Sequence, residues 1–188
     1  MNTIINSSTF DRGGGIIKYF RQENGGKHRA INKGIELATG DLFFPVDSDD
    51  TLSMDAIEKV ITNWTLYGNH KNLLGLCFRR GDPETNLMRG TPFKKVSFSS
   101  PQKINYFLGK TCDKAEIFRT DVIKENRFPV IEGEKFLTEA VWIFSISKLP
   151  HRDMVCLNDV IRFTKYYDDG LTRNWKFIME QNPNGYIL

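Results

Sequence analysis

Hydrophobic and polar positions follow one another along the first part of the chain in a way that predicts strands and helices in turn. Residues 16–20, with the sequence IIKYF, are rich in β-branched and aromatic residues and precede an Asn-Gly-Gly break, so they are predicted to form a short strand. A helix is predicted over residues 27–39, followed by Gly40, because a helix end favours a residue that tolerates positive φ. This helix has apolar residues at helical spacing: Ala30, Ile31, Ile35 and Ala38.

The next segment repeats the order of strand and helix. Residues 42–46 form an apolar run, LFFPV, which we expect to be a buried strand that leaves the sheet near Pro45, because proline cannot donate a sheet hydrogen bond. Ser53 is expected to cap a second helix, and the acidic side chains of Asp55 and Glu58 favour its positive end. The apolar stripe expected on this helix consists of Ile57, Val60, Ile61 and Trp64.

With a further strand over residues 73–78, this order predicts an α/β fold with a largely parallel sheet flanked by helices. The 188 residues fit one domain, and we interpret residues 1–15, which end in three glycines, as a flexible start. Beyond residue 78 the pattern is looser. The elements expected there are strands over residues 114–118 and 160–166, and helices over residues 120–125, 136–144 and 175–179.

Composition narrows the classes of partner. The 26 basic and 23 acidic side chains give a net charge of +3 and are interleaved, so the chain has no basic cluster of the kind that binds nucleic acid. Its 3 cysteines form no CxxC pair, which argues against a zinc site or a disulfide framework and favours reduced thiols. No signal-peptide pattern and no bilayer-spanning apolar run is present. We therefore expect a cytoplasmic protein, with a peripheral contact to the inner face of the membrane left open.

An acidic cluster follows the strand predicted over residues 42–46. Asp47, Asp49 and Asp50 stand at its carboxyl end, the edge where open α/β sheets bind ligands. In an extended chain Asp47 and Asp49 point the same way, and two such carboxylates repel unless a cation or a donor lies between them. Hard oxygen ligands suit Mg²⁺ or Mn²⁺, and such an ion would bridge the carboxylates to a diphosphate. The alternative is a solvated acidic turn that helps to start the next helix. A calcium loop is excluded, because Leu52 stands where such a loop needs glycine.

Three segments in this region resemble family 2 glycosyltransferases, which have the GT-A fold. They are residues 24–34 (NGGKHRAINKG), 38–41 (ATGD) and 46–50 (VDSDD), and their order and spacing match the family. Downstream, residues 128–139 (FPVIEGEKFLTE) and 166–172 (YYDDGLT) are similar to the acceptor-side and closing segments of one bacterial branch of that family.

The resemblance implies roles for individual donor-side residues. Asp49 matches the acid that usually contacts the divalent metal, Mn²⁺ or Mg²⁺, and Asp47 the acid near the donor ribose or the metal shell. Lys27 and Asn32 match positions that line the nucleotide side. A lysine beside a diphosphate is electrostatically favourable, although Lys27 taken alone is equally compatible with a solvated charge at a helix start.

On the acceptor side the resemblance implies a general base. Glu134 matches the region where inverting members place this base, which removes the proton of the acceptor hydroxyl as the sugar transfers. The family's frequent Glu-Asp pair reads Glu134-Lys135 here, so Glu132 and Glu139 remain alternatives. For each of the three, the other interpretation is a surface carboxylate at a helix start.

The chain also departs from the family. Members normally begin with two further strands and an intervening helix that hold the nucleotide, whereas only residues 1–15 precede Ile16. We therefore expect an N-terminally incomplete GT-A-like sheet, whose exposed edge favours pairing in a homo-oligomer.

The predicted function is metal-dependent transfer of a sugar, with inversion, from a nucleotide-diphosphate donor such as a UDP-sugar. The acceptor is a saccharide or a lipid-linked molecule, and the resemblance suggests bacterial surface polysaccharide synthesis. Two alternatives remain. One is a truncated, non-catalytic remnant acting as a binding or oligomerisation module. The other is a nucleotidyltransferase, which is disfavoured because the chain lacks a Gly-rich phosphate loop.

Overall fold

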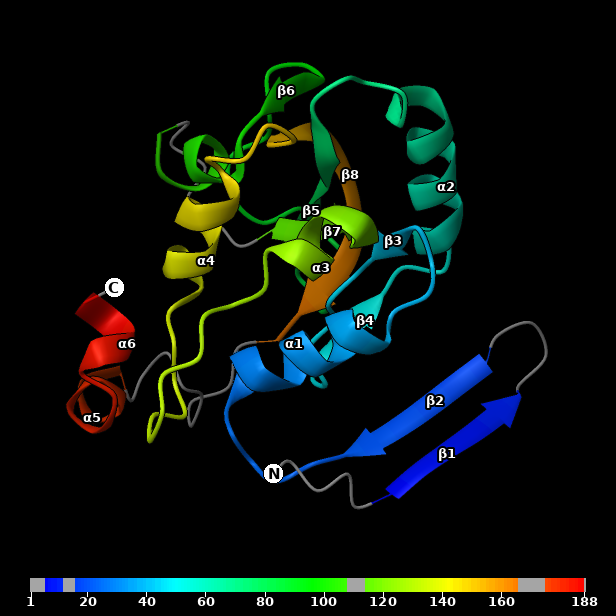
Figure 1. The fold of residues 1–188 in the computed structure, drawn as a ribbon. Coiled ribbons are helices and arrows are strands. Elements are labelled where there is room, and N and C mark those ends of the chain that lie inside the picture. Colours follow the sequence, from blue (N-terminus) through cyan, green and yellow to red (C-terminus); the bar gives the residue numbers. More distant parts are fainter. Residues whose placement is uncertain (1–5, 12–15, 108–113, 166–174, 188) are drawn as a thin grey trace.

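The structure is a computed structural model that describes residues 6–11, 16–107, 114–165 and 175–187 (Figure 1). Its main layer is a six-stranded sheet, and its helices lie around that sheet. The strands are β1 (Asn6–Asp11), β2 (Ile16–Arg21), β3 (Leu42–Phe43), β4 (Asp50–Leu52), β5 (Leu73–Gly81), β6 (Ser97–Ser99), β7 (Lys114–Arg119) and β8 (Asp153–Thr164). The helices are α1 (Lys27–Leu37), α2 (Ala56–Tyr67), the π-helical turn η1 (Lys103–Phe107), α3 (Thr120–Glu125), α4 (Glu139–Ile146), α5 (Trp175–Gln181) and α6 (Asn184–Ile187).

The main sheet has the strand order β3-β7-β5-β8-β4, and β6 pairs with β8 beside this path. β5 and β8 are parallel, with Cys77 opposite Cys156. The pairs β3–β7, β5–β7, β4–β8 and β6–β8 are antiparallel. The predicted α/β class is therefore confirmed, whereas the sheet is mixed rather than largely parallel. Strand direction depends on which strands pair, and a local pattern of apolar residues carries no information about that choice.

The core lies on both faces of the central strand β5, which is buried along its whole length. On one face the sheet packs against α1, α3 and α4. On the other face it packs against α2 through Ala56 and Val60. A strand covered on both faces reads as a continuous apolar run, which is why residues 73–78 were recognisable in the sequence.

Most elements expected from the pattern are present, with shifted ends. The helix predicted over residues 27–39 is α1. The strand predicted over residues 42–46 is shorter than expected, since β3 ends at Phe43 and leaves Pro45 outside it. β3 is only half-buried, because it is an edge strand paired with β7 alone among the described residues. The strand predicted over residues 160–166 begins earlier, at Asp153.

The predicted N-cap of α2 is wrong, and only part of its predicted apolar stripe faces the core. Ser53 does not cap the helix; its hydroxyl donates to Asp55 Oδ1 at 2.7 Å, and Asp55 holds the cap position. Ile57 and Ile61 are 58% and 60% exposed. The helix contacts the sheet along a narrow line of Ala56, Val60 and the half-buried Trp64, because it meets the sheet on one side only.

The start of the chain also differs from the prediction. Residues 6–11 are strand β1, which pairs antiparallel with β2 in a separate two-stranded sheet, so β2 is a strand as predicted but does not join the main sheet. Figure 1 shows this hairpin set apart from the six-stranded sheet. The glycines between the two runs suggested a flexible terminus, although a glycine-containing break between two β-compatible runs is also typical of a hairpin. None of the described helices combines the length and apolarity needed to cross a lipid bilayer.

Candidate functional site

The acidic segment forms a turn between β3 and β4. The backbone N–H of Asp50 donates to the carbonyl of Asp47 at 3.1 Å, which places Asp47 and Asp49 on the turn itself. Asp49 is exposed and Asp47 is half-buried. The described part of the chain contains no group of three or more His, Cys, Asp or Glu side chains arranged to hold a metal ion.

Lys27 brings two distant carboxylates together. It is the first residue of α1, and its Nζ lies 2.9 Å from Asp47 Oδ1 and 2.9 Å from Glu139 Oε1. Burial alone would lower the pKa of Lys27, but the charges and hydrogen bonds of Glu139 and Asp47 outweigh it and raise the pKa. The ammonium group therefore lies, charged, between the turn that follows β3 and the start of α4. The carboxylates of Asp47 and Glu139 thus have the Lys27 ammonium between them, which offsets their mutual repulsion.

Glu139 owes its position to the start of α4. It is the first residue of that helix, and the preceding Thr138 caps the helix by accepting from Ala140 N at 3.4 Å. Its side chain is 62% exposed, so one oxygen contacts Lys27 while the carboxylate stays open to solvent. The geometry thus brings Glu139, rather than Glu134, to the lysine that also contacts Asp47.

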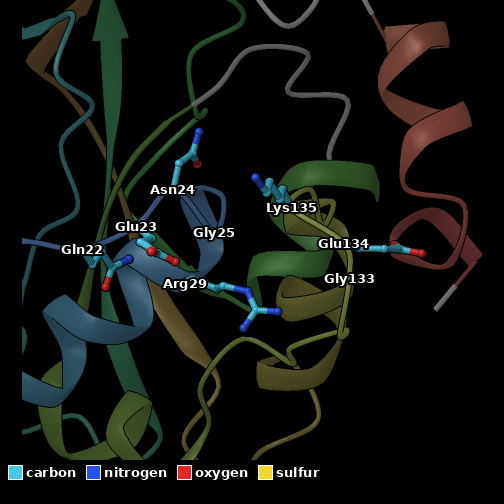
Figure 2. Close-up of a pocket in the computed structure, with 8 residues that line it drawn as sticks. All are labelled: Gln22, Glu23, Asn24, Gly25, Arg29, Gly133, Glu134 and Lys135. Atoms are coloured by element: carbon cyan, nitrogen blue, oxygen red, sulfur yellow. The ribbon is translucent and has the colours of Figure 1, made fainter. Parts of the chain in front are cut away.

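Glu134 has a different environment. Its carboxylate accepts from Asn184 N at 3.0 Å, Asn184 Nδ2 at 2.7 Å and Gly185 N at 2.7 Å, at the start of α6. Burial works to raise the pKa of Glu134, but these hydrogen bonds outweigh it and lower the pKa. Figure 2 shows the side chain directed away from Arg29 and Lys135, toward the C-terminal helices. A buried carboxylate whose oxygens are held by three donors is a poor proton acceptor for a substrate.

Asn32 also has its side chain engaged. Its Nδ2 donates to the carbonyl of Phe128 and its Oδ1 accepts from the N–H of the same residue, both at 2.9 Å. This pairing joins α1 to the segment that leads toward Glu134. Both polar groups of the Asn32 amide are therefore occupied by backbone partners. That Asn32 lines the nucleotide side stays a prediction.

Asp50, the third acid of the motif, turns inward. Its side chain is 0% exposed, with Oδ2 3.3 Å from Arg162 Nε and Oδ1 3.3 Å from Arg80 Nη2. Sequence reasoning missed both arginines. The signal was available, since arginine within an apolar strand needs a buried anionic or carbonyl partner, but the partner could not be chosen without the fold.

A pocket lined mainly by polar residues opens at the start of α1, next to the loop that precedes α4 (Figure 2). Gly26 has no room for a side chain: its φ is +93°, and a Cβ there would lie 1.7 Å from the carbonyl oxygen of Lys135. This close approach joins the start of α1 to the loop before α4. Arg29 is held in the pocket wall by donating to the carbonyl of Ile131 at 2.9 Å. The lining residues are Gln22, Glu23, Asn24, Gly25, Arg29, Gly133, Glu134 and Lys135.

The carboxylate oxygens of the acidic turn are ligands of the type that a hard divalent ion such as Mg²⁺ takes. Asp49 is exposed at the turn, and Asp47 lies next to it with its carboxylate toward Lys27. Mg²⁺ is commonly bound by one or two carboxylates together with water and phosphate oxygens. The residues present therefore suit an ion that arrives with a diphosphate rather than one held in a complete protein cage.

Comparison with known proteins gives the family. The model for glycosyl transferase family 2 matches residues 5–126, more than half of the chain, and this stretch includes Lys27, Asp47 and Asp49. A comparison with curated proteins finds no match.

Solved structures share the fold. The crystal structure of S. aureus TarS 1-349 is similar with a TM-score of 0.53 and 17% identity, over 76% of this chain and 41% of that chain. The crystal structure of S. aureus TarS is similar with a TM-score of 0.50 and 15% identity, over 84% of this chain and 27% of that chain. The chain thus spans less than half the length of either structure. These likenesses concern the fold alone, and they confirm the GT-A-like class. From the matched residues and the fold together, the chain belongs to glycosyl transferase family 2.

Proposed function

We propose that this chain transfers a sugar from a nucleoside-diphosphate donor to a hydroxyl group of a saccharide or lipid-linked acceptor. Membership of the family supports sugar transfer in general. The observation that carries the proposal is the bridge of Lys27 between Asp47 and Glu139, because it brings the donor-side and acceptor-side segments to one point.

On the donor side we assign the metal and the diphosphate to the acidic turn. Asp49, with Asp47 beside it, would hold Mn²⁺ or Mg²⁺, which supplies positive charge to the leaving diphosphate. The ammonium of Lys27 lies next to Asp47 and adds a second positive charge at the same place. A UDP-sugar is the donor class we infer from the family resemblance.

On the acceptor side we assign the general base to Glu139. An acceptor hydroxyl would give its proton to this carboxylate as its oxygen attacks the anomeric carbon and the diphosphate leaves from the opposite face, which inverts the configuration. The exposure of Glu139 and its distance to Lys27 support the assignment. The hydrogen bonds of Glu134 to α6 support a structural role for that residue instead.

The wider setting follows from the resemblance and remains part of the proposal. We infer a single cytoplasmic domain, acting in bacterial surface polysaccharide synthesis, with contact to the inner face of the membrane left open. β3 has a strand partner on one side only among the described residues, which supports pairing between copies through this edge.

Calorimetry of UDP binding with and without Mn²⁺ tests the donor site. We expect binding to the unmodified chain that requires Mn²⁺, and at least a tenfold weaker affinity in Asp49→Ala, because the ion loses its exposed carboxylate. Asp121→Ala is the matched control, since this side chain is 65% exposed and its ion pair is with Arg119. It should bind as the unmodified chain does.

The remaining outcomes identify the alternatives. Absence of UDP binding at every Mn²⁺ concentration would favour a non-catalytic binding module. Release of pyrophosphate from a nucleoside triphosphate and a sugar phosphate would identify a nucleotidyltransferase instead.

A further inference from the structure

The buried guanidinium group of Arg162 contacts the chain on both sides of the acidic turn, residues 47–50. Arg162 Nη1 donates to the carbonyl of Pro45 at 3.0 Å, two residues before Asp47. Its Nε lies 3.3 Å from the carboxylate of Asp50, the residue after Asp49. The segment that carries Asp47 and Asp49 is therefore held at both ends by a single side chain of β8.

The same guanidinium is anchored to the sheet. Arg162 Nη2 donates to the carbonyl of Lys114, on β7, at 2.7 Å. Its three nitrogens thus contact three segments, and the planar fork of arginine makes such a multiple contact directional. A lysine in this place has one nitrogen and cannot reproduce the arrangement.

Arg80 of β5 completes the support. Its Nη2 lies 3.3 Å from each carboxylate oxygen of Asp50 and donates to Thr164 Oγ1. One fully buried carboxylate is thereby shared by two buried guanidinium groups. Burial and the charge of Arg80 lower the pKa of Arg162, although Asp50 and Asp47 act in the opposite direction.

Stability alone gives a weak reason for this network. Buried ion pairs cost much of what they gain, because the charges lose their hydration, and well-packed apolar groups often serve as well. Their clearest benefit is geometric, since charge-assisted hydrogen bonds fix groups at short distances and in set directions. Here the group that is fixed is a polar turn closed by the hydrogen bond from Asp50 N to Asp47 O.

We propose that Arg162 is a positioning residue, which sets the separation of Asp47 and Asp49 from the sheet without contacting the donor. Calling the turn a donor site rests on the function proposed above. The claim that Arg162 orders the turn does not, and it is tested without any ligand.

The first test is amide hydrogen exchange over residues 44–52, measured with the melting temperature in Arg162→Met and Arg162→Lys. We expect at least tenfold faster exchange in this segment in Arg162→Met. A smaller but distinct acceleration is expected in Arg162→Lys, which keeps the charge and loses the fork. Arg162→Lys also decides the question if Arg162→Met fails to fold.

Arg79→Met is the matched control. Arg79 is another fully buried arginine, on β5, which donates to the carbonyl of Arg89 at 2.7 Å and lies 5.3 Å from the centre of the Phe93 ring. We expect Arg79→Met to lower the melting temperature and to leave exchange over residues 44–52 unchanged. Equal acceleration in the Arg79 and Arg162 variants, or none in either Arg162 variant, would overturn the proposal.

The second test links the turn to the ligand, with UDP and Mn²⁺ as probes. Arg162→Met should weaken Mn²⁺-dependent UDP binding at least tenfold, whereas Arg79→Met should bind as the unmodified chain does. If the unmodified chain does not bind UDP, the proposed function fails, and the exchange measurement still decides whether Arg162 orders the turn.

Discussion

At the residue scale, the three acids of the Asp47–Asp50 motif have three different environments. Asp49 is exposed, Asp47 is paired with Lys27, and Asp50 is buried between two arginines. A motif of adjacent acids thus combines a solvent-exposed part with a buried, ion-paired part. Two of the three acids thus have cationic partners of their own, which offsets the repulsion between neighbouring carboxylates.

The two glutamates near α4 give a residue-scale prediction. Glu139→Gln should lower the rate of sugar transfer by roughly 100-fold or more, the usual contribution of a general base, with little change in UDP binding. Glu134→Gln should leave Glu139 in place as the base and lower the melting temperature, because a charged acceptor of three hydrogen bonds is replaced by a neutral one. Turnover and UDP affinity measured on both variants separate the two roles. Loss of turnover in Glu134→Gln at full stability would reverse the assignment.

At the element scale, the start of α1 depends on contacts outside the helix. Gly26 precedes the helix with a backbone conformation that side chains rarely adopt, and the carbonyl of Lys135 fills the space where a Cβ would stand. The position of Lys27 relative to Glu139 therefore depends on a close approach between α1 and the loop before α4.

Gly26→Ala should lower the free energy of unfolding by more than about 3 kcal/mol. The conformation itself costs about 1–3 kcal/mol for alanine, and the contact with Lys135 adds a displacement of the backbone. Two glycines separate these effects. Gly133 has φ +80° with nothing within 4 Å, so Gly133→Ala carries the conformational cost alone. Gly40→Ala meets only an ordinary contact at 3.8 Å and should change stability by less than about 0.5 kcal/mol.

Denaturant unfolding of the three variants is the measurement. A loss in Gly26→Ala no larger than that in Gly133→Ala would show that the Lys135 contact is not tight. A large loss in Gly40→Ala would show that the chain is sensitive to any change near α1, and the explanation by close approach would then be withdrawn.

At the scale of the whole molecule, the mixed sheet buries titratable groups beside the site. Glu116 on β7 accepts from Asn105 Nδ2 at 3.2 Å, and Lys114 Nζ donates to Asn105 Oδ1 at 3.0 Å. Burial raises the pKa of Glu116 to about 7, with a smaller contribution from Glu139, while the Asn105 hydrogen bond acts in the opposite direction.

This shift predicts a pH dependence of global stability. The folded chain binds the proton of Glu116 more tightly than the unfolded chain does, so this group's contribution is present at low pH. It is lost as pH rises from about 4.5 to about 7, by about 3 kcal/mol in total. Glu116→Gln should lack this loss.

Unfolding free energies measured from pH 4 to 8 test the prediction through the difference between the two proteins. Glu125→Gln, at an exposed position on α3, is the control and should follow the unmodified chain. Parallel curves for Glu116→Gln and the unmodified chain would show that Glu116 titrates in its ordinary range.

Local pattern was enough to predict several features of this protein. Helix α1, the acidic turn and the family resemblance all depend on residues close together in sequence, where spacing determines which side chains share a face. The apolar run of β5 was recognisable because both faces of that strand are covered. The same reasoning found Lys27, Asp47 and Asp49 as candidates for one site.

Tertiary structure decided the features that join distant segments. The family resemblance favoured Glu134 over Glu132 and Glu139, and only the fold shows that Glu139 contacts Lys27 while Glu134 is held by α6. Long-range contacts likewise produce the pairing of β1 with β2 and the antiparallel strands of the main sheet. They also bring Arg162 to the acidic turn. The physical reason is one of range. Helical periodicity and turn preferences act between residues a few positions apart. Which strands pair, and which charges meet, depends on how the whole chain packs.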